Sequence, residues 1–62
     1  MLTADTIDDA AIDTLLHTSV LRGDHRTARL CALALNAVDA IQRHVARGHV
    51  ARILNARTKE TP

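Results

Sequence analysis

The first third of the chain has the alternation of apolar and polar positions that is typical of an amphipathic α-helix. At 100° per residue, one side of this stretch is apolar or small: Ala11, Ile12, Leu15, Leu16 and Ser19. The opposite side is polar and carries Asp9, Asp13 and His17. The pattern predicts a helix of about four turns that turns one face toward a core.

The residues at both ends of this stretch favour the same helix. Thr6 is a suitable N-cap, and Asp8 and Asp9 fall in the first turn, where the helix dipole favours negative charge. Gly23 is typical of the residue that ends a helix. We therefore expect the first helix to span about 6–22.

A second helix is predicted after the turn formed by LRGD, with Asp24 as its N-cap. Its apolar residues recur at intervals of 3, 4, 3 and 4, the spacing of a coiled-coil seam: Cys31, Ala34, Val38, Ile41 and Val45. The seam predicts a continuous helix over about 25–47 and an interface with a second copy or with a helix of another protein. Leu33 falls outside the seam and hints at a second contact surface.

Arginines follow the polar side of the second helix and continue beyond it. Four of them are candidate partner-binding residues: Arg29, Arg43, Arg47 and Arg52. Arg22 and Arg26 add to the cluster around the first turn of the helix. Such a cluster suits a nucleic acid, but the arginines do not form one stripe and the chain has no aromatic residue to stack on a base.

The repeat HVARGHVAR at residues 44–52 raises the question of whether a helix continues through Gly48. Before Gly48, the apolar side of the helix is centred on Val38 and Val45. After Gly48, the apolar side is rotated by roughly 130° about the helix axis. The later apolar set comprises Val50, Ile53 and Leu54. A straight helix cannot place both sets in one core, so we expect a stop at Gly48 and a short third helix over about 49–57. The alternative is one long helix whose twisted apolar surface faces two partners.

These elements predict one small all-α domain over 1–57, a helical hairpin of two main helices plus the short third helix. The stretch TKETP at 58–62 lacks apolar residues and is expected to be a flexible tail. The core is thin, because sixteen Leu, Ile and Val residues are accompanied by eleven Ala and no aromatic residue. The single Cys31 allows no internal disulfide, so we expect dimerisation through the second helix to complete the fold.

The net charge of +1 conceals two halves of opposite sign. Residues 1–21 carry four Asp and no Lys or Arg, which gives −4, whereas 22–62 carry seven Arg and one Lys against two Asp and one Glu, which gives +5. Such halves attract each other between helices or between copies. The longest apolar run, LCALAL, has six residues, so we expect no membrane span, no membrane partner and a cytoplasmic location.

The sequence offers little for catalysis or metal binding. Asp9, Asp13 and His17 form a ladder in steps of four, which a solvated helix face explains without a metal. The patterns HxxH, HxxxH and CxxC do not occur. Cys31 lies in the middle of the seam, where a buried structural thiol is expected rather than a nucleophile. We therefore expect no enzyme activity, no metal site and no cofactor.

The remaining function class is a protein–protein interaction module that acts as a regulator or adaptor of a macromolecular target. Its expected partners are a second copy of the chain and another protein. The alternative is a nucleic-acid-binding regulator that uses the Arg-rich second and third helices. The stretch LRGDHRTARLCALALN is similar in general character to short helical proteins of bacteria and phages, but it indicates no family.

Overall fold

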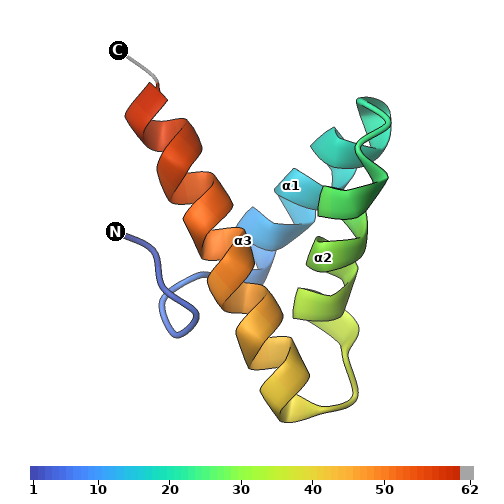
Figure 1. Cartoon of the computed structure of the whole chain (residues 1–62), viewed down its shortest axis with the longest axis vertical. Helices are drawn as coiled ribbons and strands as arrows, with labels where there is room; N and C mark the ends of the chain where they lie inside the picture. The colour runs from blue at the N-terminus through green and yellow to red at the C-terminus, as the bar shows by residue number, and fades with distance from the viewer. Residues whose placement is uncertain (61–62) are drawn as a thin grey trace.

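The computed structural model describes residues 1–60, with side chains described for 1–57. Three α-helices follow one another, and the described residues contain no strand, which confirms the all-α prediction. Their bounds are Asp9–Leu21 for α1, His25–Asn36 for α2 and Ala40–Glu60 for α3. Helix α2 packs against both α1 and α3, and Figure 1 shows α2 and α3 diverging from the turn that joins them.

Helix α1 begins later than the sequence predicted. Asp8 is its N-cap, because its side chain accepts a hydrogen bond of 2.8 Å from the backbone N–H of Ala11. Thr6, the predicted cap, instead belongs to a preceding turn in which its hydroxyl accepts a 2.8 Å hydrogen bond from the backbone N–H of Thr3. The N-cap is therefore the carboxylate of Asp8 rather than the hydroxyl of Thr6, and the helix starts at Asp9.

The turn between α1 and α2 lies where the sequence predicted it. Gly23 has a φ of 74°, a left-handed conformation that favours glycine, and it ends α1. Asp24 is the N-cap of α2, and its carboxylate accepts a 3.2 Å hydrogen bond from the N–H of Thr27.

The second helix does not continue to residue 47, as the seam predicted, but ends at Asn36. Ala37 is extended, with a ψ of 132°, and the chain turns before α3. The Asp39 carboxylate then accepts hydrogen bonds from the N–H groups of Ile41, at 2.8 Å, and Gln42, at 3.4 Å. An N-cap at Asp39 starts a new helix, so the predicted continuous helix is wrong.

The third helix is not short and does not start at Gly48. Helix α3 passes through Gly48 without a break and reaches Glu60, so residues 58–60 of the predicted tail are helical and 61–62 lie outside the described residues. The expected break assumed that all apolar residues share one core. Val38 and Val45 are exposed instead, and Val50 is buried, so one straight helix is sufficient.

The core lies where α2 meets its two neighbours and is small. It consists of Ile7, Ile12, Leu15, Cys31, Ala34, Ala46, Val50 and Ala51. The largest fully buried side chains are Ile12, Val50, Cys31 and Ser19, so none of them is larger than isoleucine. This composition agrees with the thin core expected from the sequence.

Residues 1–8, the N-terminal segment, lie along α3. The Asn55 carboxamide accepts a 3.0 Å hydrogen bond from the N–H of Leu2 and donates one of 2.8 Å to its carbonyl. Ile7 closes the segment by burying its side chain in the core. An ideal Cβ at Gly48 would lie 3.8 Å from Cβ of Ala4, so the segment crosses α3 at this glycine.

Candidate interaction surfaces

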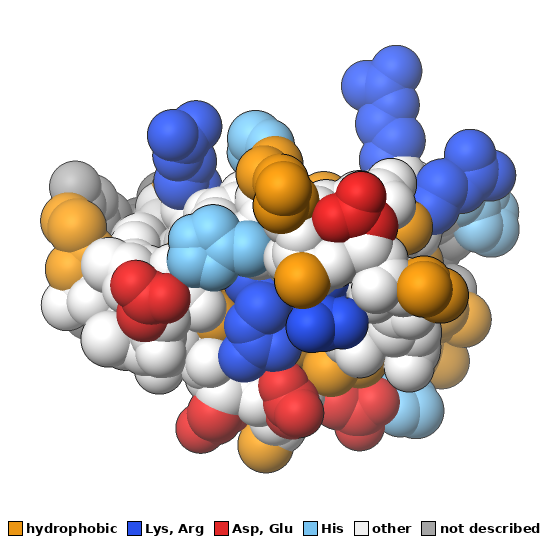
Figure 2. Space-filling view, turned by 90° about the horizontal axis from the view of Figure 1, so that it is seen from below, with side chains coloured by type: hydrophobic (Ala, Val, Ile, Leu, Met, Phe, Trp, Pro, Cys, Tyr) orange, Lys and Arg blue, Asp and Glu red, His pale blue; other side chains and the backbone are white. Residues whose placement is uncertain are grey.

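The seam expected to form an interface is divided by the break after α2. Cys31 and Ala34 are fully buried within the chain and present no surface to a partner. The other three residues are largely exposed: Val38 at 99%, Ile41 at 76% and Val45 at 53%. We call these three residues the apolar row. Figure 2 views the molecule from the end where the α2–α3 turn lies and shows hydrophobic side chains at the surface among charged ones.

The apolar row follows the start of α3. Its members are spaced by three and four residues, so Ile41 and Val45 lie on one side of the helix and Val38 precedes them in the turn. At 100° per residue, Arg52 lies on the same side of α3, two turns beyond Val45. An exposed row of this kind is a recognised mark of an interaction surface.

Two of the four candidate arginines hold the fold together rather than facing a partner. The Arg47 guanidinium, 21% exposed, donates hydrogen bonds to the Asp9 carboxylate at 2.8 Å and to the carbonyl of Ile7 at 2.7 Å. It also lies 3.4 Å from the carbonyl of Ala34. Arg43 donates a 2.9 Å hydrogen bond to the carbonyl of Ala37 and so supports the α2–α3 turn. These contacts depend on the folded chain, and no sequence pattern indicates them.

Arg29 and Arg52, the other two candidates, are exposed. Neither side chain forms a hydrogen bond or ion pair with any residue that the structure describes. Of the predicted partner-binding set, these two side chains therefore remain available to a ligand.

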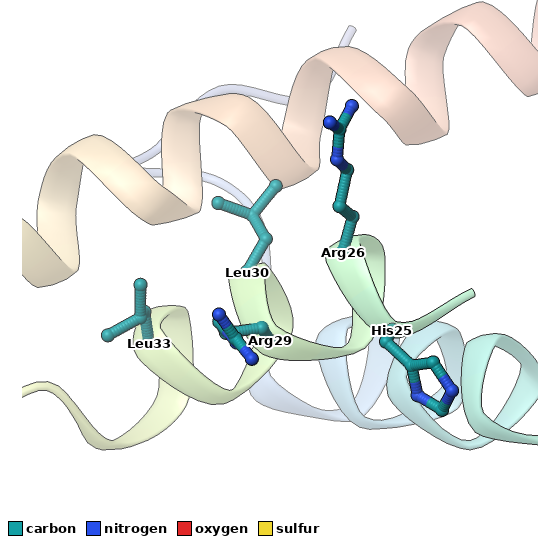
Figure 3. A pocket seen from close by; sticks show the side chains of 5 residues that line it. All are labelled: His25, Arg26, Arg29, Leu30 and Leu33. Atoms are coloured by element: carbon teal, nitrogen blue, oxygen red, sulfur yellow. The ribbon is translucent and has the colours of Figure 1, made fainter. Parts of the chain in front are cut away.

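A hollow of ≈ 310 Å³ lies along α2, and we call it the cationic groove. All five lining residues belong to this helix: His25, Arg26, Arg29, Leu30 and Leu33. Figure 3 shows Arg26 and Leu30 extending toward α3, whereas His25 points away from it. The sequence indicated part of this surface through the off-seam position of Leu33 and the arginines around the first turn, but it did not single out His25 or Leu30 as groove residues.

The first turn of α2 is electrostatically unusual. It contains His25 and Arg26 and no acidic residue, although the helix dipole favours negative charge there. The Asp24 cap offsets this. Hydrogen bonds from the Thr27 hydroxyl and N–H lower the pKa of the Asp24 carboxyl, and the charges of Arg57 and Arg26 act in the same direction.

The residues considered for catalysis and metal binding are dispersed or buried. Cys31 is inaccessible, and burial raises the pKa of its thiol, which disfavours the nucleophilic thiolate. The Asp9 carboxylate is bound by Arg47, while Asp13 lies 3.4 Å from His17 on an exposed face. Across the described residues, no three His, Cys, Asp or Glu side chains are grouped as a metal site requires.

Comparison with known proteins gives no family for this chain. No protein-family model, no curated protein and no solved structure matches it. Among the described helices, none combines the length and the apolar character needed to cross a bilayer. Any functional inference therefore depends on the surfaces described above.

Proposed function

We propose that this protein is a small non-enzymatic interaction module that self-associates and acts as a regulator or adaptor of another macromolecule. In this proposal α1 and α2 form a helical hairpin, and the apolar row contacts the same row of a second copy across a two-fold axis. The proposal places the protein in the cytoplasm. The proposed interface therefore contains only the exposed residues of the predicted seam, which are those of the apolar row.

The exposure of the apolar row is the observation that supports this proposal. Val38, Ile41 and Val45 contain no charge, so two copies of the row do not repel each other, and pairing removes aliphatic surface from water. The small core gives a second reason, because a chain with few large buried side chains gains stability from an apolar interface.

Light scattering on a sizing column, at several protein concentrations and at low and high salt, tests self-association. We expect the wild type to have about twice the chain mass of 6.7 kDa, with no loss of dimer at high salt. The double variant Val38→Asp/Ile41→Asp should be monomeric and equally helical, because both side chains are exposed within one chain.

Leu21→Asp is the matched control, because Leu21 is 88% exposed but lies at the end of α1. It should leave the mass unchanged. A wild type that is monomeric at every concentration, or a dimer that survives the double substitution in the row, would contradict self-association through the row.

Nucleic-acid binding through the Arg-rich second and third helices is the second candidate. It is supported by the exposed Arg29 and Arg52, and it is weakened because Arg43 and Arg47 donate to the protein itself. The test is the mobility of a labelled duplex at micromolar protein and increasing salt. A salt-sensitive shift would support this candidate, and no shift at low salt would remove it.

A further inference from the structure

The cationic groove combines exposed basic side chains with partly buried apolar ones. The guanidinium groups of Arg26 and Arg29 form no hydrogen bond or ion pair with the residues that the structure describes, in contrast to those of Arg43 and Arg47. Leu30 and Leu33 are only partly buried and pack against the core. The groove therefore has a basic half toward the start of α2 and an apolar half toward its end, and none of its lining residues is acidic.

The arrangement of the lining residues matches the surface of another helix. His25, Arg29 and Leu33 succeed one another at intervals of four along α2, and Arg26 and Leu30 form a parallel row. The first row extends for about 12 Å, or just over two helical turns, and the second for about 6 Å, at 1.5 Å per residue. An amphipathic helix presents its anchors at the same intervals, which is how helices bind in grooves.

The charges define the chemistry of this partner helix. Arg forms strong bidentate hydrogen bonds with carboxylates, so Asp or Glu belongs opposite Arg26 and Arg29. Aliphatic side chains belong opposite Leu30 and Leu33, where they remove partly exposed apolar surface from water. In both α2 and its partner, the charged and apolar residues then occupy corresponding halves of the contact.

A phosphate backbone satisfies only half of this surface. Its oxygens suit the arginines, but it has no apolar side to cover Leu30 and Leu33, and the chain contains no aromatic residue to stack on bases. The observations therefore favour a protein over a nucleic acid as the occupant of the groove.

We propose that the cationic groove binds an acidic amphipathic helix of a partner protein, one that carries Asp or Glu beside Leu, Ile or Val. The proposal rests on the assignment of the chain as an interaction module, but it uses a different surface from the apolar row. It would give the protein one surface for a second copy and another for its target.

Fluorescence anisotropy with three labelled peptides tests the proposal on the full chain. The first is an Ala-based helix of about four turns that carries Glu in one half of its binding side and Leu in the other half; the second replaces each Glu by Gln, and the third replaces each Leu by Ala. We expect the first to bind in a salt-sensitive manner and each replacement to weaken binding by about tenfold.

Protein variants then assign the site. Arg26→Ser/Arg29→Ser should weaken binding of the acidic peptide by about tenfold, and Arg29→Ser alone by less. Arg52→Ser is the matched control for Arg29→Ser, because it removes one exposed arginine elsewhere, and it should change binding by less than about twofold. Backbone amide chemical shifts should change on addition of the peptide mainly between His25 and Leu33.

Several results would overturn the proposal. They are no binding of the acidic peptide at about 1 mM protein, equal binding of the Gln peptide, or an equal loss in Arg52→Ser. A DNA duplex that displaces the peptide through Arg26 and Arg29 would assign the groove to phosphates instead, and a loss with Val38→Asp/Ile41→Asp but not with Arg26→Ser/Arg29→Ser would assign binding to the apolar row. Peptide binding by a monomeric wild type would refute self-association and leave this inference intact.

Discussion

Arg47 joins distant parts of the chain through one side chain. It extends from α3 to the carboxylate of Asp9 at the start of α1 and to the carbonyl of Ile7 in the N-terminal segment. A second carbonyl, that of Ala34, lies near it at the end of α2. One guanidinium thus links every helix, since its planar fork can donate in several directions.

Replacing Arg47 by Met should lower the free energy of unfolding by about 2 kcal/mol, because two carbonyls lose a charged donor that the apolar side chain cannot replace. Urea denaturation followed by far-UV circular dichroism measures the change. Arg52→Met is the control and should have little effect. Equal stabilities of the two variants would mean that the Arg47 contacts contribute nothing.

Ser19 shows the opposite situation, a polar side chain without use in the fold. It is buried in α1, and its hydroxyl has no hydrogen-bond partner among the described residues. Ser19→Ala removes this hydroxyl and raises helix propensity, so we expect a gain of about 0.5–1 kcal/mol in urea denaturation. A clear loss of stability would show that the hydroxyl has a binding partner in solution.

The residues at the helix ends decided which helix boundaries could be predicted from the sequence. Gly23 and Asp24 combine a helix stop with a helix cap, and the structure has both. The break before α3 has neither Gly nor Pro, so the regular apolar spacing concealed it. Asp39 followed three residues later by Gln42 is the pattern of a capping box, and this signal could have located the start of α3.

The two glycines test this account of the helices. Gly48→Ala should stabilise the protein by about 0.5–1 kcal/mol, because alanine favours a continuous helix and its Cβ makes an ordinary contact with Ala4. Gly23→Ala should destabilise it by about 1–2 kcal/mol, because alanine disfavours a φ of 74°. Thermal denaturation compares the two, and a destabilising Gly48→Ala would contradict either the continuous helix at Gly48 or the ordinary contact with Ala4.

The Asp24 cap gives α2 a pH dependence. Since its pKa is lowered in the folded protein, ionised Asp24 adds stability above its ordinary pKa of 3.8, and this is lost as the pH falls through the lower folded value. Asp24→Asn keeps an acceptor for the N–H of Thr27 but loses the charge. The variant should be less stable near pH 7, and its deficit should shrink below about pH 4 in parallel urea titrations. A deficit independent of pH would exclude the charge as its cause.

At the scale of the whole molecule, the sequence predicted the class of the fold better than its surfaces. Apolar spacing placed Ile12 and Leu15 on the core-facing side of the first helix. It assigned the buried Cys31 and Ala34 to the same interface seam as the exposed Val38 and Ile41. That distinction arises because α2 ends at Asn36 and the N-terminal segment covers α3. Likewise, only the folded chain brings Arg47 to its acceptors, so an arginine of the fold and an arginine of a binding site look alike in the sequence.

The thiol of Cys31 is a probe of unfolding, because it is fully buried in α2, the helix that packs against both others. We expect its thiol to react with a disulfide reagent only when the protein opens, so the labelling rate should rise with urea in parallel with the unfolded fraction. Fast labelling of the native protein would show that the core opens locally. A disulfide-linked dimer in the native state would contradict the buried position of Cys31.

The paired hydrogen bonds between Leu2 and Asn55 also impose an order on folding. They join residues 53 positions apart, so they close a long loop, and contacts of such sequence separation form after local ones. Helices α1 and α2 are neighbours along the chain and can meet first, whereas the N-terminal segment has nothing to lie against until α3 is in place. Leu2 and Ile7 are therefore exposed in any state that precedes the docking of α3, and such a state offers apolar surface to chaperones or to other chains.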